Sequence, residues 1–344
     1  MSVGLQQPVS VDVTAEPDEP ITVKARGYWE LVFIRFRRDK LAVVSFGVIV
    51  LLFAAAFAGA PLAAYLLGHG PNDIFAYGVN PSSFTPVGPW SHISTAEYIG
   101  QPGHHPSTLL IFGGADQLGR DLFLRILYGA QISLEVGVFA TAGSVGLGIM
   151  MGLIAGYFRG WVDTVISRLI EIVMVFPYLL FVIALRIVAG NALTGITLGF
   201  LPHGVFMLAV IFSVFGWFYP ARIMRGVVLS LREKEFVEAA RMTGASDWRI
   251  MRSHLLPHLV APIIVYSTLL IAQNILAEAG LSFLGLGINP DTPSWGTLLA
   301  QAPSYYQTDV WILLFPGFAI LITTVAFNLL GDGLRDAFDP RSTI

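Results

Sequence analysis

Long apolar segments, separated by shorter polar ones, are the main feature of the hydrophobic pattern of this chain. Six segments carry no charged residue, apart from Arg168, Glu171 and Arg186 in the third. They are residues 41–67, 136–158, 165–188, 204–221, 259–277 and 311–331. A helix needs about 20 predominantly apolar residues to cross the hydrocarbon core of a bilayer. The pattern therefore predicts an all-α membrane protein with six transmembrane helices.

The composition agrees with a chain that mostly faces lipid. Of 344 residues, 55% are hydrophobic and only 12% are charged, whereas soluble globular proteins have about 25% charged residues. Buried helices of a large soluble protein do not account for six such segments in one chain. The net charge of −3 does not favour nucleic acid as a partner. Because cysteine is absent, disulfides, thiolate metal ligands and cysteine nucleophiles are excluded.

Lysine and arginine are distributed unevenly among the segments that join the predicted helices. Cytoplasmic segments of membrane proteins carry an excess of these residues. The excess lies before the first helix, between the fourth and fifth, and after the sixth, in Lys24, Arg26, Arg35, Arg37, Arg38, Lys40, Arg222, Arg225, Arg232, Lys234, Arg241, Arg249, Arg252, Arg335 and Arg341. The opposite segments hold only Arg120, Arg125 and, at a helix end, Arg186. We therefore expect both termini in the cytoplasm.

The polar segments divide the chain further. The first twenty residues are acidic and polar and lack the basic start of a cleavable signal peptide, so we expect a disordered cytoplasmic tail over residues 1–27. Residues 28–40 form either a helix in the cytoplasmic interface or an extension of the first span, 41–67. Residues 68–130 are extracytoplasmic, irregular at first and then an amphipathic helix. The remaining core, 131–344, contains the other five spans.

Two further features lie within this core. A face of small residues spaced by four, on the second span, predicts close packing against another helix rather than a pore lining; it consists of Ala140, Ser144, Gly148, Gly152 and Gly156. Ionisable residues near the span ends are functional candidates by default, although water is within their reach. These are Glu135, Arg168, Glu171, Arg186 and Glu278. A short outer helix is expected from Ser294, before the sixth span.

The loop at 230–258 joins the fourth and fifth spans on the cytoplasmic side and is rich in charge. Ser230, with a glutamate three residues later, fits a capping box at the start of a helix. Gly244 suits the left-handed residue that ends a helix, and Ser246 the cap of a second short helix. Pro257 then predicts a break before the fifth span. The loop is thus expected to form two short helices joined by a sharp turn.

This loop resembles the EAA loop of ABC importer permeases, E-A-A-x3-G-x9-I-x-L-P, with His254 in place of the isoleucine. The residues that match are Glu238, Ala239, Ala240, Gly244, Leu256 and Pro257. Other stretches are similar to the C subunit of dipeptide, oligopeptide and nickel permeases, while residues 69–113 match least. These stretches are "RRDKLAVV" (37–44), "DQLGRDLFLRILYGAQISL" (116–134), "AGYFRGWVD" (155–163), "LSFLGLGINPDTPSWG" (281–296) and "NLLGDGLRDAFDPR" (328–341).

The resemblance implies a type I ABC importer fold with a cytoplasmic coupling helix at the EAA loop. It also implies a homologous B-type permease subunit, two ABC ATPase subunits and an extracytoplasmic substrate-binding protein as partners. The expected place is the bacterial plasma (inner) membrane. The chain itself has no G-x-x-x-x-G-K-[ST] phosphate loop, so ATP and Mg²⁺ would bind to the ATPase subunits and this chain would be a pore-forming subunit rather than an enzyme.

Short peptides are the expected substrate, with nickel or another small solute as the alternative. No substrate-binding residue is assigned from the sequence. A secondary transporter, the more distant alternative, would need titratable groups near the bilayer centre, where four of the six spans have none. A membrane-embedded enzyme is disfavoured because His254 and His258 lack the glutamate of H-E-x-x-H. His104, His105 and Asp116 are the candidates for an outer metal site, but loop histidines are more often solvated, and no metal ligand is assigned.

Overall fold

The computed structural model describes residues 27–96, 98–99, 108–175, 177–194 and 204–339, so the expected tail lies almost wholly outside the described part. The helices are α1 (Tyr28–Arg38), α2 (Lys40–Ala54), α3 (Ala60–Leu67), α4 (Leu122–Phe158), α5 (Gly160–Val175), α6 (Tyr178–Thr194), α7 (Val205–Gly216), α8 (Phe218–Leu231), α9 (Glu235–Met242), α10 (Asp247–Arg249), α11 (Leu256–Phe283), α12 (Trp295–Leu299), α13 (Ala302–Tyr305) and α14 (Trp311–Phe338). The strands are β1 (Ile74–Phe75), β2 (Ser91–Ser94), β3 (Tyr98–Ile99) and β4 (Thr108–Ile111).

Four helical stretches in the described chain are long and apolar enough to cross a membrane, and two bent helix pairs bring the total to six. The continuous stretches are Lys40–Leu67, Leu122–Phe158, Asp247–Phe283 and Trp311–Phe338. The pair α5 and α6 is bent by 83°, and the pair α7 and α8 by 43°. This confirms the all-α membrane fold, and it shows two spans that are broken rather than straight.

Proline accounts for both breaks. Pro177 lies between α5 and α6, where it cannot donate a helical hydrogen bond and disfavours helical geometry in the residue before it. Pro220 occupies the third position of α8, so the chain bends at Trp217 and restarts the helix there. Both prolines are visible in the sequence, but their effect is stronger than the uninterrupted apolar pattern suggested.

The small-residue face of α4 packs against α7 and α8, as predicted. A β-carbon placed on Gly148 would lie 2.4 Å from Cβ of Pro220, and one on Gly152 would lie 2.6 Å from the carbonyl oxygen of Ala221. One on Gly156 would lie 2.8 Å from the side chain of Val228. Real β-carbons do not approach other atoms this closely, so glycine is what lets α8 lie against α4.

The outer segment differs from the expected irregular loop. β1 pairs with β3 and β2 pairs with β4, both antiparallel, over a small core of Phe75, Ile93, Leu109 and Ile111. The strands are two to four residues long, too short for their alternation to stand out among prolines and glycines. We call residues 68–121 the outer cap.

The outer cap is tied to the membrane helices by buried charge at the start of α4. Arg120 forms an ion pair with Asp116 at 2.7 Å, and Arg125 lies 3.3 Å from the same carboxylate. Arg125 also donates to the side chain of Asn72 at 2.7 Å. Asp121 caps α4 by accepting from the backbone N–H of Phe123. α4 then continues without a break, so the expected outer amphipathic helix is the first part of the second span.

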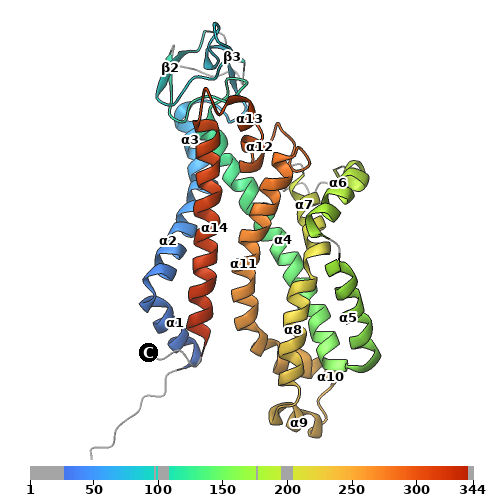
Figure 1. Cartoon of the computed structure of the whole chain (residues 1–344). Helices are drawn as coiled ribbons and strands as arrows, with labels where there is room; N and C mark the ends of the chain where they lie inside the picture. The colour runs from blue at the N-terminus through green and yellow to red at the C-terminus, as the bar shows by residue number, and fades with distance from the viewer. Residues whose placement is uncertain (1–26, 97, 100–107, 176, 195–203, 340–344) are drawn as a thin grey trace, which may run out of the picture.

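The ends of the bundle carry different structures. Figure 1 shows the outer cap, α12 and α13 at one end, and α1, α9 and the C-terminal end of α14 at the other. α1 is separated from α2 by Asp39, whose side chain caps α2, so it is a distinct helix rather than an extension of the first span. Ser294 begins α12 with a capping box, as expected. The loop of interest thus lies at the end that carries α1.

Candidate functional site

The loop between α8 and α11 starts later than the sequence indicated. α8 continues to Leu231, and the hydroxyl of Ser230 donates to the carbonyl of Val227 within the same helix. Glu233 instead pairs with Arg159, at the end of α4. The predicted capping box is therefore wrong. The apolar face of α8 extends through Val228 into the cluster under the loop, which favours continuing the helix.

The first helix of the loop, α9, ends in a turn that depends on Gly244. The N–H of Ala245 donates to the carbonyl of Ala240 at 3.0 Å, and the N–H of Gly244 donates to that of Arg241 at 2.9 Å. These two bonds form a Schellman motif, with Gly244 in the left-handed conformation at φ 79°. The predicted positive φ of Gly244 is confirmed.

The second helix of the loop is the beginning of a much longer one. α10, a π-helical stretch at Ile250–Leu255 and α11 form a continuous helical run from Asp247 to Phe283. The expected break at Pro257 is absent, because Pro257 lies in the first turn of α11 and follows a stretch with shifted hydrogen bonds. Ser246 precedes α10 but its side chain makes no capping hydrogen bond.

Apolar and polar contacts fix the loop to the neighbouring ends of α4 and α8. Val237 and Leu255 are fully buried in one cluster, with Ala240, Ile250, Met251, Leu153, Met224 and Val228. The hydroxyl of Tyr157 on α4 donates to Asp247 at 2.5 Å. The guanidinium groups of Arg232 and Arg241 lie 5.7 and 5.4 Å from the centre of the same tyrosine ring. The loop is therefore packed and hydrogen-bonded directly against both spans.

Charge gathers beside α9. The Arg159 guanidinium lowers the pKa of the exposed Glu233 carboxyl through a hydrogen bond and its positive charge. Burial lowers the pKa of Arg232, and the neighbouring charges of Arg159 and Arg241 act in the same direction. These residues line a hollow of about 610 Å³ together with Glu238 and Met242. The hollow carries more positive than negative charge.

The six residues that match the EAA loop divide into two groups. Glu238, Ala239, Gly244 and Pro257 are exposed, whereas Ala240 is buried and Leu256 is half-buried. The outward face of α9 consists of Glu235, Glu238, Ala239 and Met242, at helical spacing. Sequence reasoning missed the exposed apolar side chains around this face, which are Phe236, Met242 and Trp248. Their signal was present in the sequence as large apolar residues with charged residues beside them.

The histidines do not form a metal site in the described part of the chain. The ring of His258 lies 5.1 Å from that of Phe236, and His254 is half-buried on the π-helical stretch. His104 and His105 lie outside the described residues. Among the residues that the structure places, no three His, Asp or Glu side chains gather as ligands would.

Comparison with known proteins gives consistent relatives. Residues 148–344 match the family described as binding-protein-dependent transport system inner membrane component, and residues 27–77 match the N-terminal transmembrane domain of oligopeptide transport permease C. The chain is 36% identical to the dipeptide transport system permease protein DppC of Alkalihalophilus pseudofirmus, over 96% of both chains. It is 35% identical to the glutathione transport system permease protein GsiD of Pectobacterium atrosepticum, over 94% of this chain and 93% of that one.

A solved structure shares the fold. An inward-facing MetNI methionine ABC transporter chain aligns with a TM-score of 0.51 at 16% identity, over 62% of this chain and 96% of that chain. The helices at the core of this chain therefore have the arrangement of a type I ABC importer permease. On the family match, and on relatives that align over nearly its whole length, the chain belongs to the binding-protein-dependent transport system inner membrane components, within the C-type permeases of ABC importers.

Proposed function

We propose that this chain is the permease subunit of an ATP-driven importer that moves short peptides into the cytoplasm. The two relatives described above are permeases for dipeptides and for glutathione, which is itself a short peptide. Both align over more than nine tenths of the chain, so the similarity includes the membrane core as well as the loop. Di- and oligopeptides are accordingly the proposed cargo.

The observation that carries the proposal is the attachment of the cytoplasmic loop. One face of α9 is buried against the ends of α4 and α8, and the opposite face, with Glu238 and Ala239, is exposed. A partner that binds the exposed face of α9 and moves it also displaces α4 and α8, which pack against the opposite face. We propose that this partner is an ABC ATPase subunit, with ATP and Mg²⁺ bound there and none bound by this chain.

The full assembly in this proposal contains a homologous B-type permease, two ATPase subunits and an extracytoplasmic binding protein. The loop and both described ends of the chain lie at the same end of the bundle, which supports placing both termini in the cytoplasm (Figure 1). The outer cap then faces the extracytoplasmic side, where the binding protein delivers its cargo.

Uptake by vesicles that contain the whole complex tests the proposal. Labelled di- to oligopeptides should accumulate only when ATP and the binding protein are both present. Labelled nickel, measured in the same vesicles, should not accumulate. Uptake of nickel without peptides would reject the peptide assignment, and ATP-independent peptide uptake would reject the coupling to an ATPase.

A further inference from the structure

An exposed ion pair lies at membrane depth on α5. Nη1 of Arg168 lies 2.5 Å from Oε2 of Glu171, and their side chains are 72% and 59% exposed. At 1.5 Å per residue, they lie about 12 to 17 Å along α5 from its start at Gly160. The hydrocarbon core of a bilayer is about 30 Å thick, so the pair lies well inside the span rather than near its end, as the sequence suggested. Charges at this depth need water, a partner or a ligand around them.

The neighbouring helix α8 adds an unpaired cation at the same depth. Arg222 lies about 13 Å from the end of α8 at Leu231. Its side chain is exposed, and it makes no ion pair or hydrogen bond within the described part of the chain. Arg225, one turn nearer the cytoplasm, donates to Oδ2 of Asp163 on α5 at 2.7 Å. Because Glu171 pairs with Arg168 and Asp163 pairs with Arg225, neither carboxylate neutralises the charge of Arg222.

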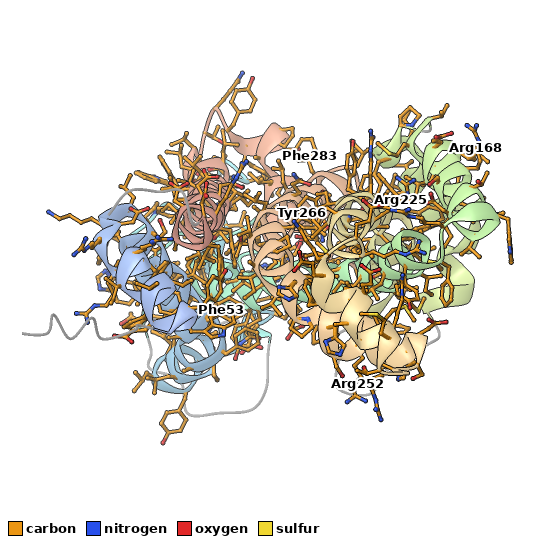
Figure 2. The ribbon with its side chains drawn as sticks, turned by 90° about the horizontal axis from the view of Figure 1, so that it is seen from below. Phe53, Arg168, Arg225, Arg252, Tyr266 and Phe283 are labelled. Atoms are coloured by element: carbon orange, nitrogen blue, oxygen red, sulfur yellow. The ribbon has the colours of Figure 1, made fainter. Side chains whose placement is uncertain are left out.

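Glu171, Arg222 and Arg225 line one groove between α5 and α8. Its volume is about 250 Å³, and it is lined by Ser167, Ile170, Glu171, Met174, Arg222 and Arg225. Figure 2 shows Arg168 and Arg225 on the side of the molecule toward Phe283, with Arg252 on the opposite side. A groove that holds an uncompensated cation at membrane depth cannot face acyl chains without a large cost, so we place it on a water-filled path.

We propose that this groove is a carboxylate-binding subsite on the inner half of the translocation path, in which Arg222 receives the C-terminal carboxylate of a peptide. The assignment rests on the proposed peptide function. A guanidinium binds a carboxylate through two parallel hydrogen bonds, which fits the unpaired Arg222. Glu171 is already neutralised by Arg168, so it does not repel the incoming group. A groove of this size admits the end of a peptide and leaves its side chains outside.

The test measures protection of the groove in the assembled complex in nanodiscs. The chain has no native cysteine, so the Ser167→Cys variant places a single thiol on the groove wall. Modification by N-ethylmaleimide is followed by mass spectrometry of the peptide that contains position 167. Tri-alanine should slow the modification, and tri-alanine amide, which lacks the carboxylate, should not. Arg222→Gln should weaken the protection about tenfold or more, and Arg222→Lys should restore part of it.

Arg38→Gln is the matched control, because Arg38 is an exposed arginine on α1 without a described partner. It should leave protection unchanged. Equal protection by peptide and amide, or protection that survives Arg222→Gln, would overturn the subsite, whereas peptide uptake by the wild type tests the proposed function separately.

Two other sources of an anion give distinct results. If modification without peptide is slower in anionic than in neutral nanodiscs, and peptide has no effect, then a lipid headgroup occupies the groove and the subsite is rejected. If Arg222→Gln separates the two permease subunits on size exclusion, the partner subunit supplies the carboxylate and the subsite is likewise rejected.

Discussion

The backbone of Gly244 sets the shape of the loop between α8 and α11 at the scale of a single residue. Its φ of 79° closes the Schellman turn, and nothing lies within 4 Å of the place where a β-carbon would be. Space is therefore not limiting at this position, and any penalty for a side chain comes from its backbone conformation. The order of tolerance should follow the cost of a left-handed residue, with asparagine better than alanine and alanine better than valine.

Gly244→Val is predicted to uncouple the complex without unfolding the chain. A β-branched residue in the left-handed region costs roughly 1–2 kcal/mol, so the turn should open and misplace α9. Substrate-stimulated ATPase activity of the assembled complex should be lost, while the chain still reaches the membrane. Gly226→Val is the control, because Gly226 has free space around it and no positive φ. Full stimulation in the Gly244→Val complex would contradict the role of the turn.

Asp121 is predicted to make the stability of the outer cap depend on pH. Burial raises the pKa of Asp121 from 3.8 to about 6. Between these two pH values, the folded state therefore keeps a proton on Asp121 that the unfolded state has released. Stability should therefore fall as the pH rises from about 4 to about 6. Asp121→Asn keeps an acceptor for the N–H of Phe123 and should flatten this dependence in melting curves of the purified complex. An unchanged slope in the variant would exclude Asp121 as its source.

At the scale of the element, α9 is a short helix with one buried and one exposed face. Val237 and Ala240 hold it to the spans, and Ala239 lies on the exposed side with Glu238. Because Ala239 has little bulk, a partner can approach the helix backbone closely. The two faces can therefore be tested separately by substitution.

Ala239→Trp is predicted to keep the loop folded but to hold the ATPase away. Coupled ATPase activity and peptide uptake should both fall to background, and pull-down of the ATPase subunits should weaken. Ala239→Ser, which adds one oxygen atom, should behave like the wild type. Wild-type turnover in the tryptophan variant would show that this face does not meet the ATPase.

The contact between α4 and α8 gives a prediction about stability. Gly152→Leu places atoms where the backbone of α8 already lies, 2.6 Å from the carbonyl oxygen of Ala221, so the helices must separate. Overpacking of this kind typically costs 1–3 kcal/mol. The melting temperature of the complex should drop, whereas Gly146→Leu, on an open part of the same helix, should have little effect. Equal melting temperatures would mean that the contact is not tight in the membrane.

The elements also show how far the sequence could predict the structure. Apolar length located the spans, and the spacing of small residues located the α4–α8 contact, because both depend on local composition. Gly244 was identified because glycine, which has no side chain, readily takes the left-handed conformation that ends a helix, and Ser294 because its hydroxyl suits the start of one. The end of α8 was misjudged because Ser230 fits a helix start locally, and tertiary packing overrides that preference. The bends and the paired strands of the outer cap depend on contacts between distant segments, which periodicity does not reveal.

At the scale of the whole molecule, the orientation of the chain across the bilayer can be tested directly. Ser82, Ser246 and Ser304 are all exposed, in the outer cap, in the loop between α8 and α11, and in α13 respectively. Because native cysteine is absent, a cysteine at each position gives an unambiguous signal. An impermeant thiol reagent applied to intact cells should label Ser82→Cys and Ser304→Cys but not Ser246→Cys. Labelling of Ser246→Cys in intact cells, without labelling of Ser82→Cys, would show that the chain has the opposite orientation.

The uninterrupted length of α4 has a mechanical consequence for the whole molecule. Its 37 residues make a rod about 55 Å long. Arg125 anchors one end of this rod to Asn72 in the outer cap, and Tyr157 anchors the other to Asp247 in the loop between α8 and α11. A rod of this length that pivots at one end moves the other by about 1 Å for each degree of tilt. The two ends of the bundle are therefore joined by one continuous helix, so a tilt of α4 at the loop end displaces the outer cap without a series of side-chain rearrangements between them.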